Sequence, residues 1–197
     1  MGSWGDFYAG EVDLSTYFTT LSHHAPFMEA ILAAEPRRTV EAGCGTAVKS
    51  SFLALTGVDA VAVDNDPQVL EVARKAAARW PAQPRFVEHD IFKLTELELE
   101  ADVVFSQGVL EHFEDEQIVS LARESLAVAP RFIFSVPSRW YGHRDFGNER
   151  LMDAPAWGAI LEPAGHVEVR PYFFARRRGT RGLRRPLMLM ATVTRRG

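Results

Sequence analysis

The chain has 197 residues, of which 47% are hydrophobic and 24% charged, and its formal net charge is −4. This composition is typical of one globular domain and excludes a collagen-like, low-complexity or disordered chain. The single cysteine, Cys44, excludes an internal disulfide and a multi-cysteine zinc site. The sequence shows neither a secretory leader nor an apolar run of about 18 residues, so we expect a soluble cytoplasmic protein without membrane contact.

The predicted elements alternate between strand and helix after an N-terminal stretch that is helical in part, residues 11–35. Short apolar runs bounded by turn residues predict buried strands at residues 39–40, 58–63, 85–88, 102–106 and 132–136. Apolar residues at three-to-four spacing predict helices, one beginning at Asp66-Pro67 and another ending before Pro130. Near-continuous apolar strands separated by helices indicate a parallel sheet that helices cover on both faces.

The pattern changes after Pro137. Residues 138–152 are polar and aromatic, and a short helix is predicted near residues 155–161. Two longer strands, 167–174 and 186–194, then predict an antiparallel hairpin at one edge of the sheet.

Arginine gathers in the last part of the chain. Residues 170–197 hold nine arginines and no acidic residue, and the segment 176–185 between the two last predicted strands is the richest. Such a basic stretch can meet a phosphate, an acidic substrate or nucleic acid. The alternative is a solvated hairpin whose charge offsets an acidic remainder.

A glycine-containing turn follows the first predicted strand and reads Glu41-Ala42-Gly43-Cys44-Gly45-Thr46-Ala47. Glycines let the backbone bend sharply and let a ligand approach the main chain, and the helix that follows begins with unpaired N–H groups. Asp64 ends the second predicted strand 19 residues after Gly45. A carboxylate at that place accepts hydrogen bonds from a ribose diol, so the pattern predicts a nucleoside-containing cofactor.

The turn favours a cationic cofactor over a dinucleotide. The sixth position counted from Gly43 is Val48, so the third glycine of the dinucleotide fingerprint is missing. Glu41 stands just ahead of the turn, where an acid is unhelpful beside a diphosphate but attracts a cationic group, directly or through water. A sulfonium that carries an amino-acid ammonium is such a ligand.

At these residues the sequence resembles the class I S-adenosylmethionine-dependent methyltransferases of small bacterial type. The matching segments are the first motif at 40–47, with Ala47 in place of the last glycine, the second-strand motif at 61–64, the third-strand motif at 89–91 and the fourth-strand motif at 102–113. The resemblance covers about residues 37–138. It implies an α/β fold of three layers, Rossmann-like and doubly wound, with a seven-stranded, mostly parallel sheet and an antiparallel C-terminal strand.

The resemblance also implies which residues bind the donor. Asp64 would hold the ribose, Asp90 would accept from the adenine amino group, and Ile91 would pack on the adenine ring. The full predicted set for the cofactor is Glu41, Gly43, Cys44, Gly45, Asp64, Asn65, Asp90, Ile91 and Gln107, with no metal. The alternatives are that Asp64 caps a strand end and that Asp90 caps the following turn.

We expect one methyltransferase domain over residues 1–197, without a separate substrate domain. Within it, residues 1–35 form an N-terminal helical lid, 36–138 the cofactor-binding core, and 139–197 a substrate-side loop and β-hairpin. The N-terminal aromatic residues either close over the donor or pack a helix on the sheet; they are Trp4, Phe7, Tyr8, Tyr17 and Phe18.

Methyl transfer from a sulfonium needs alignment and exclusion of water, and it needs a general base only where the acceptor arrives protonated. His112 and His143 are the predicted catalytic residues. His112 is a base, a substrate contact or a structural hydrogen-bonding residue, and the loop around His143 is a substrate wall or an ordered surface loop. Further candidates for the base are His23, His24, Tyr141, Asp145 and Glu149.

The predicted function is transfer of a methyl group from S-adenosylmethionine, with S-adenosylhomocysteine as product, to an oxygen or nitrogen nucleophile of a small-molecule acceptor. The alternatives are a methyltransferase acting on RNA or protein, and a noncatalytic protein that binds S-adenosylmethionine. A nicotinamide-dependent oxidoreductase has less support. Nucleic acid is not favoured, because no Asn-Pro-Pro-Tyr motif follows the fourth predicted strand.

Overall fold

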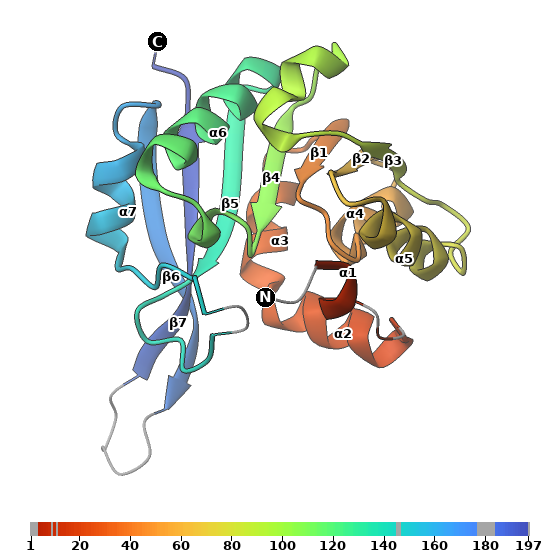
Figure 1. The fold of residues 1–197 in the computed structure, drawn as a ribbon, viewed down its shortest axis with the longest axis horizontal. Helices are drawn as coiled ribbons and strands as arrows, with labels where there is room; N and C mark the ends of the chain where they lie inside the picture. Colours follow the sequence, from red (N-terminus) through yellow and green to blue (C-terminus); the bar gives the residue numbers. More distant parts are fainter. Residues whose placement is uncertain (1–3, 9, 11, 145–146, 177–183, 197) are drawn as a thin grey trace.

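The computed structural model describes residues 4–8, 10, 12–144, 147–176 and 184–196. At its centre lies a seven-stranded sheet in the order β3-β2-β1-β4-β5-β7-β6 (Figure 1). The strands are β1 Arg38–Ala42, β2 Asp59–Asp64, β3 Arg85–Glu88, β4 Val103–Gln107, β5 Arg131–Pro137, β6 His166–Arg176 and β7 Arg184–Thr194. Strands β1 to β5 are parallel, and β7 pairs antiparallel with both β5 and β6. The predicted fold class is confirmed.

Helices cover both faces of the sheet and complete three layers (Figure 1). The α-helices are α1 Trp4–Phe7, α2 Leu14–His23, α3 Ala25–Leu32, α4 Val48–Leu55, α5 Pro67–Ala77, α6 Asp115–Val128 and α7 Ala154–Leu161. Two 3₁₀ helices, η1 Ile91–Leu97 and η2 Leu110–His112, follow β3 and β4. Helices α3, α4 and α5 pack on one face, and α6, α7 and η1 on the other. Within the described residues, no helix has the length and apolar character to span a membrane.

Aspartates fix where several of these helices begin. The side chain of Asp66 accepts hydrogen bonds from the Gln68 and Val69 backbone N–H groups, and Pro67 follows at the first helical position. Asp13 and Asp153 cap α2 and α7 in the same way. Each carboxylate satisfies backbone donors that have no partner within the helix, so the predicted helix start at Asp66-Pro67 is confirmed.

The core lies on both sides of the central strands because their side chains alternate between the two faces. Val104 and Phe132 pack against α6 and α7 on one face, whereas Val103, Phe105 and Ile133 pack against α3 on the other. All five are buried. Burial on both faces explains why these strands are near-continuous apolar runs in the sequence.

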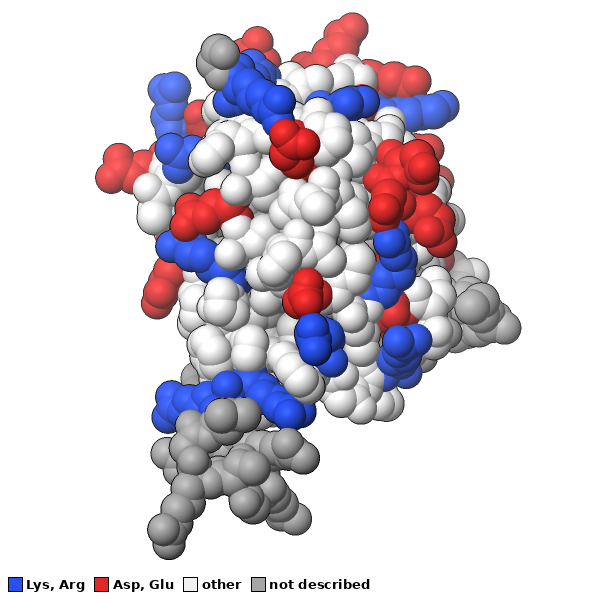
Figure 2. Space-filling model, turned by 90° about the vertical axis from the view of Figure 1, so that its left-hand side faces the viewer, with Lys and Arg blue, Asp and Glu red and all other residues white. Residues whose placement is uncertain are grey.

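Some boundaries differ from the sequence predictions. Asp102 precedes β4 instead of opening it, because its carboxylate accepts from the backbone N–H groups of Arg37 and Arg38 at 2.8 and 2.9 Å. Both strands of the hairpin are longer than predicted. Residues 177–183 of the arginine-rich segment lie outside the described residues. Beside them, basic side chains gather at the foot of the hairpin (Figure 2), where the Arg185 guanidinium stacks on Trp140 at 3.8 Å.

Candidate functional site

A large cavity lies where the strand order of the sheet reverses. The chain leaves β1 towards β2 on one side, and β4 leads to β5 on the other. In doubly wound sheets, ligands bind outside the carboxyl ends of the strands at this switch point. A cavity of about 470 Å³ occupies it, which we call the donor cavity. Six of the nine predicted cofactor residues line it: Gly43, Gly45, Asp64, Asn65, Asp90 and Ile91.

Asp64 ties the glycine turn to the end of β2. Its carboxylate accepts from the backbone N–H of Gly45 and from that of Asp66, both at 3.1 Å. Partial burial raises the pKa of this carboxyl group. Two oxygens offer about four acceptor positions, so Asp64 retains acceptor capacity towards a diol in the cavity. The capping interpretation and the ligand interpretation of Asp64 are therefore compatible.

The turn itself needs glycine. Gly43 and Gly45 have φ of +71° and +51°, in the left-handed region that L side chains rarely adopt. A Cβ on Gly43 would lie 2.7 Å from Val109 Cγ2. Ala47, which stands where the motif has its last glycine, has a φ of +50° as well. This alanine therefore adopts a left-handed conformation that glycine adopts without strain.

Glu41 lies beneath the turn and outside the lining of the donor cavity. Its Oε2 accepts from Ser50 Oγ at 2.6 Å and from the Ser50 backbone N–H at 3.2 Å. Burial raises the pKa of Glu41 and lowers that of Lys49, and the opposite charges partly offset both shifts. Glu41 thus anchors the first turn of α4 to β1. Lys49, which the sequence analysis did not select, is its buried counter-charge.

Cys44 and Gln107 also lie away from the donor cavity. Cys44 packs in a small apolar cluster with Ala62 and Leu70, and burial raises the pKa of its thiol. Gln107 ends β4 and lines a second cavity instead. Cys44 is therefore part of the packing, whereas Gln107 faces the second cavity.

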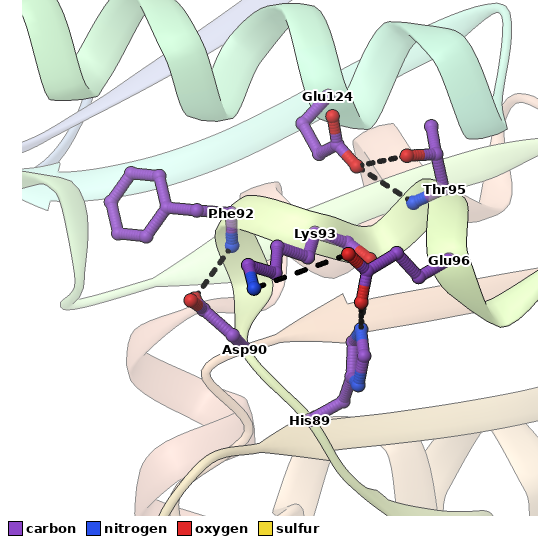
Figure 3. A network of polar contacts seen from close by, with 7 residues as sticks. All are labelled: His89, Asp90, Phe92, Lys93, Thr95, Glu96 and Glu124. Carbon is purple, nitrogen blue, oxygen red and sulfur yellow. Dashed lines mark hydrogen bonds and ion pairs between the residues drawn. The ribbon is translucent and has the colours of Figure 1, made fainter.

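Asp90 serves as a cap and as a cavity residue. Its Oδ1 accepts from the Phe92 backbone N–H at 2.9 Å and so begins η1 (Figure 3). Ile91, the first residue of η1, lines the donor cavity with it. The far side of η1 is held to α6, because the backbone N–H and the hydroxyl of Thr95 donate to Glu124 at 2.7 and 2.6 Å (Figure 3). Hydrogen bonds at both ends of η1 therefore hold Asp90 and Ile91 in position at the donor cavity.

A second cavity, of about 240 Å³, adjoins the first, and we call it the acceptor cavity. The two share four lining residues: Trp4, Tyr8, Gly108 and His112. The rest of the acceptor cavity comes from separate parts of the chain: Phe7, His24, Gln107, Glu111, Pro137, Tyr141, His143, Glu149 and Met188. Both predicted catalytic histidines thus line it, and His112 stands on the shared wall.

Asn148 and Trp4 are among the contacts of His112. Its Nδ1 lies 2.8 Å from Asn148 Oδ1, and its ring meets the edge of Trp4 with centroids 5.1 Å apart. Because an amide oxygen accepts, Nδ1 carries the proton of this hydrogen bond. The structural hydrogen bond expected as one alternative is therefore present, and it orients the ring.

His24 belongs to a buried hydrogen-bonded chain. Its Nδ1 lies 2.7 Å from the Tyr172 hydroxyl, which in turn bonds the Ser135 hydroxyl. Burial lowers the pKa of His24 to about 3. His24 is therefore neutral near pH 7 and a poor proton acceptor, although it lines the acceptor cavity. Tyr172 and Ser135 are site neighbours that no sequence motif pointed to.

The N-terminal segment covers the shared mouth of the two cavities. Trp4 and Tyr8 stack with ring centroids 6.2 Å apart. The Tyr8 hydroxyl lies over the glycine turn, 2.9 Å from where a Cβ on Gly45 would stand. Burial, together with the charge of Asp64, raises the pKa of Tyr8. Tyr17 packs apart from this mouth, on Trp80.

Two buried carboxylates are notable in the acceptor cavity. Glu149 was among the further sequence candidates, whereas Glu111 was not selected although it precedes His112 in the fourth-strand motif. The one feature of the sequence that points to Glu111 is its position directly before His112. Within the described part of the chain, no group of three or more His, Cys, Asp or Glu residues is placed to hold a metal ion.

The family model of the methyltransferase domain matches residues 40–129, the segment that contains the glycine turn, Asp64 and Asp90. The matched segment is somewhat less than half of the chain, and over it the chain is similar to methyltransferases. The match supports an enzyme that transfers methyl groups, and two of the similar solved structures hold S-adenosylmethionine or S-adenosylhomocysteine. No curated protein matches the sequence of this chain.

Several solved structures share the fold of this chain. Magnesium protoporphyrin IX methyltransferase from Synechocystis PCC 6803, with bound SAH, has a TM-score of 0.67 at 19% identity, covering 95% of this chain and 90% of that one. The methyltransferase domain of bacterial CtHen1 has a TM-score of 0.69 at 17% identity, covering 90% and 100%. A methyltransferase from Clostridium acetobutylicum ATCC 824 has a TM-score of 0.66 at 13% identity, covering 89% and 92%.

Proposed function

We propose that this protein is an S-adenosylmethionine-dependent methyltransferase that transfers the methyl group to an oxygen or nitrogen nucleophile of a small-molecule acceptor, by in-line displacement. The observation that carries the proposal is the pair of cavities that meet at Gly108 and His112. The donor cavity is of the size that holds a cofactor, and the acceptor cavity is smaller and partly closed by Trp4 and Tyr8. Such a covered space suits a small molecule better than a nucleic acid or a protein surface.

The residues around the donor cavity fit the cofactor. The glycines at 43 and 45 leave the main chain accessible, and the Asp64 carboxylate stands at the lip with acceptor capacity for the ribose hydroxyls. Asp90 and Ile91 would meet the adenine edge and face. The donor supplies a methyl group already activated on a sulfonium. The protein's own task is therefore to bind, to align and to exclude water.

His112, on the wall that the two cavities share, can act as the general base when the substrate must lose a proton. His112 lines both cavities, and His143 lines the acceptor cavity. A hydroxyl or ammonium acceptor loses its proton before or during attack, and a histidine side chain can take up that proton. We assign this role to His112 first, because its orientation is fixed by Asn148.

Calorimetric titration with S-adenosylmethionine and S-adenosylhomocysteine, with NAD as control, tests the donor site. Micromolar binding of the adenosyl ligands alone is expected. Transfer of a labelled methyl group is then compared between a panel of small molecules and preparations of RNA or protein. Label in the macromolecules alone would contradict the proposal, and binding without transfer to either would indicate a noncatalytic protein.

His112→Ala tests the role of the shared wall. As a general base, His112 contributes about 10²- to 10⁴-fold to kcat, and its loss should leave the affinity for S-adenosylhomocysteine nearly unchanged. His89→Ala is the matched control, because His89 bonds the Lys93 carbonyl at 2.8 Å and lies outside both cavity linings. A parallel loss of stability and activity in His112→Ala would favour the purely structural role.

A further inference from the structure

The acceptor cavity has an acidic wall. Glu111 and Glu149 line it with side chains that are largely withdrawn from solvent, since the two residues are 3% and 6% exposed. Glu111 lies on η2, directly after the end of β4, and Glu149 on the loop that follows β5. A backbone hydrogen bond of 2.8 Å from Arg150 N to Glu111 O joins the two segments. The segments that carry the two glutamates are thus joined through the backbone.

The neighbouring arginine directs its charge elsewhere. The guanidinium of Arg150 donates to the Phe113 carbonyl at 2.8 Å and to Asp115 at 2.5 Å, away from the residues that line the acceptor cavity. Among the described residues, the acidic side chains that line this cavity are Glu111 and Glu149, and its basic side chains are those of His24, His112 and His143. The influence of Glu111 extends across the cavity, because its charge contributes to the raised pKa of both Tyr8 and Tyr172.

Aromatic rings form much of the remaining wall. Trp4, Phe7, Tyr8 and Tyr141 all line the acceptor cavity. The face of an aromatic ring attracts a cation within about 6 Å of its centre, and rings around a cavity recognise ammonium groups in this way. Carboxylates and rings together favour a positive charge, whereas a carboxylate or phosphate in the same place would meet two like charges at low local dielectric.

We propose that the acceptor is a small amine that enters the acceptor cavity as its ammonium ion, with Glu111 and Glu149 as counter-charges and the aromatic rings as walls. This inference rests on the proposed function and narrows the oxygen-or-nitrogen nucleophile to nitrogen. It assigns the site a class of substrate, a small organic ammonium, and it assigns Glu111 and Glu149 to substrate binding.

The chemistry balances with these groups. The ammonium first gives one proton to His112 Nε2 or to one of the two carboxylates, which frees the nitrogen lone pair. The nitrogen forms the new bond to the methyl carbon while the carbon–sulfur bond breaks, and that electron pair stays on sulfur. The products are an N-methylated ammonium and a neutral thioether, so the cationic charge that entered the acceptor cavity as substrate leaves as product.

Binding to the complex with S-adenosylhomocysteine tests the inference without turnover. The probes are benzyltrimethylammonium and benzoate, which carry opposite charges on the same ring and are followed by calorimetry. We expect the cation to bind and benzoate not to bind. The variants Glu111→Gln and Glu149→Gln keep the side-chain shape, and each should weaken binding of the cation about tenfold or more. Glu162→Gln is the control, because Glu162 is exposed on the surface and pairs with Arg196.

Transfer to benzylamine and to benzyl alcohol supplies the second readout. Benzylamine should be the better acceptor, and Glu111→Gln should lower its kcat/KM while leaving the affinity for S-adenosylhomocysteine unchanged. Preferred transfer to the alcohol, binding of benzoate in place of the cation, or equal binding of the cation to the glutamine variants each overturns the inference and leaves the proposed function standing. Transfer to macromolecules alone, or failure to bind the adenosyl ligands, overturns the proposed function itself.

Discussion

The donor cavity and the acceptor cavity share a wall, yet they are built in different ways. The six predicted cofactor residues in the donor cavity lie within three residues of the end of β1, β2 or β3, whereas the rest of its lining comes mainly from α1 and the residues after β4. The acceptor cavity gathers α1, His24 between α2 and α3, the end of β4 with η2, the loop after β5, and β7. The first arrangement follows from the fold, whereas the second depends on segments that vary most easily. Most of the acceptor cavity therefore lies outside residues 40–129, which match the family model, although Gln107, Gly108, Glu111 and His112 lie within them.

The largest effect is expected beneath the donor cavity. Glu41→Ala should lower the free energy of unfolding by about 2–3 kcal/mol, because it removes the acceptor of both Ser50 hydrogen bonds and an opposite charge that acts on buried Lys49. Urea denaturation measures it. Glu71→Ala is the control, since Glu71 pairs with Lys75 on the exposed side of α5 and should matter little. A loss in Glu41→Ala no larger than that of the control would mean that the glycine turn does not depend on this anchor.

Donor affinity should respond next. Asp64→Ala removes a charged acceptor from the lip of the donor cavity and should raise the Kd of S-adenosylhomocysteine by about 10- to 100-fold. Asp66→Ala is the matched control: it removes the cap of α5 and should cost about 1 kcal/mol of stability without changing that Kd. Calorimetry separates the two. An unchanged Kd in Asp64→Ala would remove Asp64 from the donor site.

The free energy of unfolding should depend on pH through His24, which lines the acceptor cavity. His24 has a pKa of about 3 in the folded chain, below its ordinary value of 6.5, so the unfolded chain binds the extra proton between these values. Stability is therefore present above pH 6.5 and lost as the pH falls towards 3, by up to about 1.4 kcal/mol per pH unit. Denaturation of wild type and His24→Gln at pH 7 and pH 5 measures it. Equal pH slopes in the two proteins would contradict the burial of this imidazole.

The smallest effect is expected at the altered position of the glycine turn. Ala47→Gly relieves a left-handed alanine, at about 1 kcal/mol, but it loses a buried methyl and adds freedom to the unfolded chain. We expect a net change within about 1 kcal/mol and an unchanged donor Kd. Ala73→Gly in the same apolar cluster is helical and should cost about 1–2 kcal/mol. If both variants lose the same free energy of unfolding, glycine at position 47 does not relieve backbone strain in the turn.

The same contrast explains what could be predicted from the sequence. Gly43, Asp64 and Asp90 were found because each lies beside an apolar strand, and parallel strands bring their carboxyl ends to one edge. The sequence predicted that Glu41 attracts the cofactor, whereas in the structure its carboxylate accepts from the Ser50 hydroxyl at the start of α4, at 2.6 Å. The spacing of these two residues in the sequence does not indicate this hydrogen bond.

The acceptor side could be predicted only in outline. His112, His143 and the loop after β5 were expected there, since they follow strand ends. His24 was one base candidate among several, and its partner Tyr172 lies 148 residues away in the sequence. Glu111 was overlooked, because its burial depends on the loop that carries Glu149. Spacing along the chain does not encode contacts of this range.

The position of β7 sets an order of events during synthesis. This strand pairs with both β5 and β6 and is the last of the seven along the chain. While a ribosome is still making it, β5 has a bare edge and β6 has no partner, although β1 to β4 can already pair. The nascent chain therefore exposes an apolar strand edge, a site for unwanted association, until β7 emerges. A stop codon before Arg184 would leave this edge permanently open.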